Sequence, residues 1–252
     1  MKTLLLFGAG FVAGLMNAIA GGGTIVTFPA LLFAGLPAIP ANATSTMALL
    51  PGTITAVIGY RKNLPATWRW ILLFLPASAL GGLLGGILLT CTPAQVFDRL
   101  VPFLILFATV VFMARGLIVR IFPIKNRQRA SRRWLAGALV FQFLVSLYGG
   151  YFGAGIGILM LASLGLLGFS DIHEMNVVKG VLGFVINVMA AVYFALRHLV
   201  HWPEAGVVAL GGITGGFLGA HFAQRVPQRV VRWAITTIGL GLSAALFYQR
   251  LG

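Results

Sequence analysis

Two glycine-rich stretches hold the residues of this chain whose types and spacing indicate binding chemistry. The first is NAIAGGGTIVTFPALL (residues 17–32) and the second is YGGYFGAGIG (residues 148–157). Glycine lets a backbone turn without a Cβ clash, and the N–H groups of the helix that follows then face the break. Such a helix N-terminus carries a partial positive charge and binds anions. We expect an anion to lie between two such breaks, whose glycines are Gly21, Gly22, Gly23, Gly153, Gly155 and Gly157.

Polar side chains accompany the breaks and could donate hydrogen bonds to the anion. They are Asn17, Thr24, Ser45, Asn176 and Asn187. Lys179 adds a formal positive charge in an apolar segment, where a central lysine costs about 2.5–3.5 kcal/mol on insertion scales and indicates function. The alternative is that Lys179 reaches the membrane–water interface beside Asp171 and Glu174. No carboxylate lies inside an apolar segment, which favours an anion over a cation as the ligand.

Close helix packing is the alternative explanation for every glycine cluster. Small residues spaced by four let two helices approach without any ligand. We expect this role for the pairs Gly10/Gly14, Gly81/Gly85 and Gly211/Gly215. For residues 21–23 and 153–157 we favour a binding site, because the neighbouring Asn17, Thr24 and Pro29 have no packing rationale.

The composition predicts an integral membrane protein. Hydrophobic residues are 59% of the 252 and charged residues only 9%, whereas a soluble domain carries about 25% charged residues. Apolar runs of the roughly 20 residues that cross a bilayer recur along the whole chain. The net charge of +14 is explained by basic cytoplasmic loops, so no nucleic-acid partner is expected. The single Cys91 excludes an internal disulfide and a thiolate metal cluster.

Self-comparison predicts that the chain is two copies of one unit. Residues 80–86 and 210–216 share five identities in seven positions, and Asn42 aligns with Asn176. The first 20 residues alone resemble a signal peptide, but their later copy cannot be one, which favours a retained membrane segment. The predicted units are a first transmembrane repeat (1–119), a basic cytoplasmic linker (120–134) and a second transmembrane repeat (135–252).

Charge and span count predict the topology. The densest basic loop, residues 120–133, is placed in the cytoplasm, and all but four of the 18 basic residues then lie on that side. Each half has an odd number of crossings, so the two halves insert in opposite orientation. The predicted fold is therefore an all-α inverted repeat of two five-segment halves. Each half begins with a Gly-broken helix pair, re-entrant or discontinuous, and both termini lie outside the cytoplasm.

The paired glycine motifs resemble a known family. GLMNAIAGGGTIVTFPALLFAGLP and ANATS in the first half, with SLYGGYFGAGIG and NVVKG in the second, resemble the TauE/SafE sulfite exporters, also called toluene sulfonate uptake permeases. The similarity covers nearly the whole chain. It implies a multi-pass carrier in a bacterial-type inner membrane for sulfite, sulfonates or related sulfur-containing anions.

These observations lead to one functional hypothesis with two alternatives. The hypothesis is a secondary transporter of a small sulfur oxyanion, with membrane lipids around it, no cofactor, no metal and no enzymatic activity; a homodimer remains an open alternative. A passive anion channel cannot be separated from a carrier by sequence. An intramembrane enzyme is disfavoured, because neither HExxH nor GxSxG occurs. His198 and His201 could bind a metal, but an interfacial pair beside Trp202 is the preferred interpretation.

Overall fold

The computed structural model describes residues 1–19, 22–59, 64–121, 132–166, 169 and 172–222, with four isolated positions near the C-terminus (237, 240, 241 and 244). Every regular element within these ranges is an α-helix. The helices are α1 (Lys2–Ile19), α2 (Thr24–Phe33), α3 (Ala38–Gly59), α4 (Leu64–Cys91), α5 (Ala94–Ile121), α6 (Arg132–Tyr151), α7 (Ile156–Leu166), α8 (Ile172–Leu196) and α9 (Trp202–Phe222).

The helices are apolar and long enough for a bilayer. Leu64–Cys91, Ala94–Val111 and Glu174–Leu196 are each long and apolar enough to cross a membrane, and shorter apolar helices accompany them. Large apolar side chains such as Leu80, Leu84 and Leu88 on one face of α4 are exposed on the protein surface. An exposed apolar band of this kind requires lipid around it. The prediction of an all-α integral membrane protein is confirmed.

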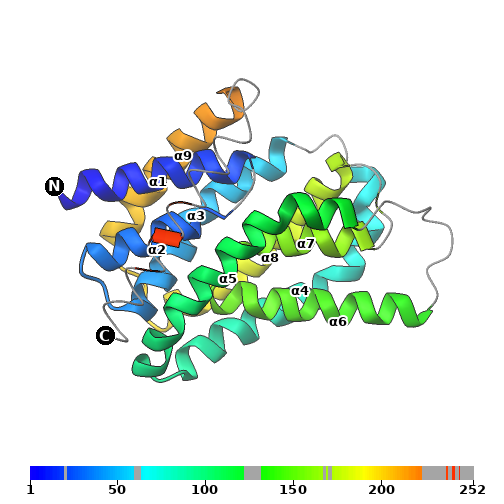
Figure 1. Cartoon of the computed structure of the whole chain (residues 1–252), viewed down its shortest axis with the longest axis horizontal. Helices are drawn as coiled ribbons and strands as arrows, with labels where there is room; N and C mark the ends of the chain where they lie inside the picture. Colours follow the sequence, from blue (N-terminus) through cyan, green and yellow to red (C-terminus); the bar gives the residue numbers. More distant parts are fainter. Residues whose placement is uncertain are drawn as a thin grey trace.

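The helices run between two ends of the molecule (Figure 1). At one end α4 is joined to α5 and α8 to α9; at the other end α5 finishes and α6 begins. We call these the outer and the inner end, after the orientation that the basic residues predict. A hydrogen bond between Thr90 and Tyr193 ties α4 to α8 near the outer end.

Two pairs of consecutive helices, α1 with α2 and α6 with α7, pack against each other, and we call each pair a hairpin. α1 ends at Ile19 and α2 begins at Thr24; α6 ends at Tyr151 and α7 begins at Ile156. α2 has 10 residues and α7 has 11, so each is about 15 Å long, half of the hydrocarbon thickness. α2 returns to the outer end, where Gly35 lies beside the Lys2 ammonium. α7 returns to the inner end, where Phe169 packs on Trp70 of α4.

Glycines let two pairs of helices pack backbone to backbone. Gly10 and Gly14 of α1 lie on the α9 backbone, and Gly211 and Gly215 of α9 lie on the α1 backbone. In the same way Gly81 and Gly85 of α4 contact the α6 backbone. Because van der Waals contact replaces the hydrophobic effect as the attraction between helices in lipid, such close approach stabilises the pairs. The packing role predicted for these glycines is confirmed.

This packing predicts a site-specific loss of stability. A Cβ on Gly85 would collide with the Leu147 carbonyl oxygen, so Gly85→Ala should lower the unfolding free energy by about 1–3 kcal/mol through overpacking. The matched control is Gly137→Ala on α6, because a Cβ at this position would have no described neighbouring atom within 4 Å. Thermal unfolding of the purified protein in detergent compares them. Equal melting temperatures for the two variants would contradict the packing account.

Candidate functional site

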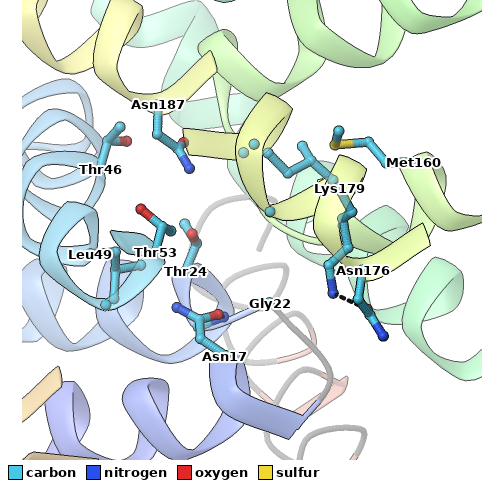
Figure 2. A pocket seen from close by; sticks show the side chains of 17 residues that line it. Asn17, Gly22, Thr24, Thr46, Leu49, Thr53, Met160, Asn176, Lys179 and Asn187 are labelled. Atoms are coloured by element: carbon cyan, nitrogen blue, oxygen red, sulfur yellow. Dashed lines mark hydrogen bonds between the residues drawn. The ribbon is translucent and has the colours of Figure 1, made fainter. Parts of the chain in front are cut away.

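A cavity of about 140 Å³ lies between the turns of the two hairpins and the middle of α3 and α8. A cavity needs roughly 10–15 Å³ of this volume for each water molecule, so it can hold a hydrated small anion. Figure 2 shows the side chains that line it. The lining residues are Asn17, Gly22, Gly23, Thr24, Thr46, Leu49, Gly52, Thr53, Gly153, Ile156, Gly157, Met160, Asn176, Lys179, Gly180, Gly183 and Asn187.

The first hairpin presents the start of α2 to the cavity. Gly22 has φ +95°, a conformation that side-chain-bearing residues rarely adopt, and it makes the turn. The N–H of Gly23 donates to Asn17 Oδ1 at 2.9 Å. Asn17 therefore satisfies a backbone donor of the break, and the N-terminus of α2 at Thr24 faces the cavity.

The second hairpin presents the start of α7 from the opposite side. Gly153 and Gly155 have φ +79° and +78°, and the Tyr148 hydroxyl donates to the Ala154 carbonyl oxygen at 2.8 Å. Gly153 and Gly157 line the cavity. Gly155 does not: a Cβ on it would face Ala108 of α5, at 3.8 Å from the Ala108 Cβ. Its positive φ gives it a role in shaping the turn.

α8 supplies the charged and amide side chains. Lys179 Nζ donates to Asn176 Oδ1 at 2.9 Å, and both residues line the cavity (Figure 2). Gly157 of α7 makes room for this lysine, because a Cβ there would lie 3.3 Å from Lys179 Cδ. Asn187, two turns further along α8, lines the same cavity. Lys179 lies about 10 Å along α8 from its inner-end start.

α3 contributes residues that the sequence analysis missed. Thr46, Leu49 and Thr53 lie on one face of α3 and line the cavity. The predicted Ser45 instead is fully buried, with its hydroxyl 2.6 Å from the Thr27 hydroxyl of α2. The spacing of residues 46, 49 and 53 is the i, i+3, i+7 pattern of one helix face, and this signal could have selected Thr46 over Ser45.

The predicted site residues therefore divide into three groups. Those that the cavity brings together are Asn17, Gly22, Gly23, Thr24, Gly153, Gly157, Asn176, Lys179 and Asn187. Ser45 and Gly155 lie in neighbouring contacts outside it. Gly21 lies outside the described residues, as does Asp171.

The cavity lining is suited to an anion. Among the described residues that line it, Lys179 carries the charge, and no carboxylate is present. Two helix N-termini add partial positive charge from opposite sides. Asparagine and threonine side chains provide donors, and Leu49, Ile156 and Met160 provide apolar contact.

The histidine pair lies away from this cavity. His198 and His201 are exposed at the turn between α8 and α9, with the exposed Trp202 beside them. His201 Nδ1 is 4.0 Å from a Glu204 carboxylate oxygen. Within the described part of the chain no group of three His, Cys, Asp or Glu side chains could hold a metal ion.

Comparison with known proteins gives a family and several relatives. The sequence model of the family described as "Sulfite exporter TauE/SafE" matches residues 6–246. A Haemophilus influenzae protein named "Probable membrane transporter protein" is 31% identical over 98% of this chain and 94% of its own length. A Sinorhizobium protein named "Probable membrane transporter protein ORF9" is 28% identical over 96% of this chain and 90% of its own length. "Probable membrane transporter protein YfcA" of Escherichia coli K12 is 27% identical, covering 98% and 90%. No solved structure matches the chain.

Proposed function

The chain belongs to the TauE/SafE sulfite exporter family of membrane transporters, and we propose that it carries small sulfur-containing anions, sulfite or sulfonates, by alternating access. The observation that carries the proposal is the position of Lys179 in a cavity between two glycine-flanked helix starts. The bacterial relatives are named membrane transporters, which favours transport over catalysis.

The chemistry of the cavity lining supports an oxyanion as the substrate. An anion that leaves water loses strong hydration, and helix N-termini restore only part of it. Lys179 and the amides of Asn17, Asn176 and Asn187 would supply the remaining charge and donors. A lysine offers a point charge without the bidentate fork of arginine. Such a site should attract several pyramidal or tetrahedral oxyanions with little preference among them.

The pairing of helices supports an inverted repeat. Exchange of the two predicted halves interchanges the α1–α9 pair with the α4–α6 pair, and both pairs pack glycines against the partner's backbone. Examples are Gly14 on Gly212 and Gly215 on Phe11 in the first pair, and Gly150 on Gly82 and Gly85 on Leu147 in the second. Inverted halves with sites at their interface are typical of alternating-access carriers.

The inverted repeat makes a prediction about topology. Five segments in each half leave both termini outside the cytoplasm, so a reporter that is active only in the cytoplasm should be silent when it is fused after Gly252. The same reporter inserted in residues 122–131 should be active, because this basic loop is retained inside. Strong activity of the Gly252 fusion would contradict the topology.

Reconstitution in liposomes tests the transport function itself. We expect purified protein to catalyse saturable uptake of sulfite, sulfate, sulfoacetate or thiosulfate, with counterflow when unlabelled anion is loaded inside. Counterflow requires a site that is exposed to one side at a time, so flux without saturation or counterflow would indicate a passive channel. Absence of flux for all four anions would contradict the proposed substrate class.

Lys179→Met tests whether the charge of Lys179 contributes to the affinity for the anion. This change keeps the length of the side chain and removes its charge, and a hydrogen bond to a charged group contributes about 1.5–3 kcal/mol. The apparent affinity for every transported anion should therefore fall by about 10- to 100-fold, with little change in their ranking. Lys2→Met, at an exposed outer-end lysine, is the control and should match the parent. An unchanged affinity in Lys179→Met would make Lys179 an interfacial anchor.

A further inference from the structure

Equivalent residues of the two predicted halves differ in exposure. Asn176 and Lys179 of α8 are half-buried and line the cavity. Their sequence counterparts in α3, Asn42 and Ser45, are fully buried. The cavity therefore extends toward the inner end, where α8 begins, and stops short of the outer end, where α3 begins.

An aromatic contact lies next to the cavity on the side of the outer end. Thr24 lines the cavity and Phe28, one turn further along α2, packs edge-on against Phe152 with ring centroids 5.3 Å apart and planes at 83°. Both rings are buried, at 0% and 1% exposure. Because Phe152 directly precedes the cavity-lining Gly153, this ring pair closes the outer side of the second hairpin turn.

Polar contacts of α3 complete the closure. Thr46 lines the cavity, and one turn toward the outer end Asn42 Nδ2 donates to the Tyr151 carbonyl oxygen at 3.0 Å. The Thr44 hydroxyl oxygen accepts the His201 N–H at 3.0 Å. The Tyr151 ring packs edge-on against Phe97 of α5. The end of α6 is thus contacted by α2, α3 and α5.

We propose that these contacts are the closed outer gate of the cavity, with Phe28 and Phe152 as its plug and Asn42 as a positioning residue that holds the plug through the Tyr151 backbone. The proposal rests on alternating access, the function proposed above. In this conformation the cavity is reached from the inner end, and separation of α2 and α3 from the α6–α7 turn would expose it to the outer end.

One buried polar atom destabilises the closed gate and so favours its opening. Asn42 Oδ1 is buried without a hydrogen-bond partner among the described residues, although the Nδ2 of the same amide is bonded. Burial of an unsatisfied acceptor destabilises the conformation that buries it. Because an opened gate would hydrate this oxygen, the penalty brings the closed and open conformations closer in free energy. A carrier needs both conformations to be populated.

Cysteine labelling from one side of the membrane tests the gate. The reporter is Thr46→Cys, because Thr46 lines the cavity one turn from Asn42. It is made in a Cys91→Ser background, because Cys91 is exposed and would itself react. In oriented vesicles, a membrane-impermeant thiol reagent should label this cysteine readily from the inner face and slowly from the outer face. Phe152→Ala should raise the outer-face labelling rate by about tenfold or more, because it removes a buried aromatic contact that keeps the gate closed.

A matched control separates gating from general loosening. Phe74→Ala removes a ring that is equally buried, at 1% exposure, and stacked on Trp70 away from the gate. Outer-face labelling should stay within about twofold of the parent, and Phe28→Ala should reproduce Phe152→Ala. If alanine prevents insertion, Phe152→Leu should give a smaller increase of several-fold, and inner-face labelling verifies the fold of each variant.

Two results would overturn the gate. One is outer-face labelling that does not rise in the Phe152 and Phe28 variants; the other is an equal rise in Phe74→Ala. The labelling needs no transported substrate. A liposome screen that finds no flux would therefore contradict the substrate class without testing the gate. Outer-face labelling that is unchanged in the Phe152 and Phe28 variants, together with normal counterflow, would contradict the gate alone.

Discussion

A helix that breaks at membrane depth must have its free backbone groups covered by protein, and the rest of this structure depends on that requirement. The described glycines of the two breaks, Gly22, Gly23 and Gly153, line a cavity between the helices. Asn17 accepts the Gly23 N–H at the first break, and the Tyr148 hydroxyl donates to the Ala154 carbonyl at the second. The starts of α2 and α7 line the same cavity, at Thr24 and Ile156, and backbone hydrogen bonds such as Ile25 N–H to the Gly22 carbonyl oxygen close their first turns.

The glycine packing follows from the same requirement. Short half-helices such as α2 cannot span the bilayer, so longer helices must surround them closely. Backbone-to-backbone packing of α1 on α9 and of α4 on α6 attaches the long helix of each hairpin to another long helix. Described glycines of the chain thus have distinct uses. Those with positive φ turn the backbone, and those at the α1–α9 and α4–α6 contacts remove the side chain that would hold two helices apart.

The sequence predicted the class of fold and most of the cavity wall, because composition and glycine spacing are local signals. Membrane helices follow from apolar runs, and a break follows from three consecutive glycines. The sequence did not indicate which face of α3 lines the cavity. Ser45 and Thr46 are adjacent residues that both carry a hydroxyl, and only the rotation of the helix about its axis decides which of them faces the cavity. Gly155, which we also predicted in the site, turns the backbone beside the cavity, and a Cβ on it would face Ala108. The Phe28–Phe152 contact joins residues more than 100 positions apart, and no local pattern indicates such a pair.

The sequence difference between the two predicted halves gives the two ends of the cavity different side chains. In the second half, Asn176 has its Oδ1 satisfied by Lys179, one turn away on the same helix. In the first half, Ser45 stands in the place of that lysine, and its short hydroxyl bonds Thr27 instead of reaching Asn42. In this conformation Asn42 Oδ1 is buried without a hydrogen-bond partner among the described residues. Lys179 thus places a charge on the inner side, whereas the outer side holds an unsatisfied acceptor, whose burial is unfavourable. The proposed site and the proposed gate both depend on this difference between the two predicted halves.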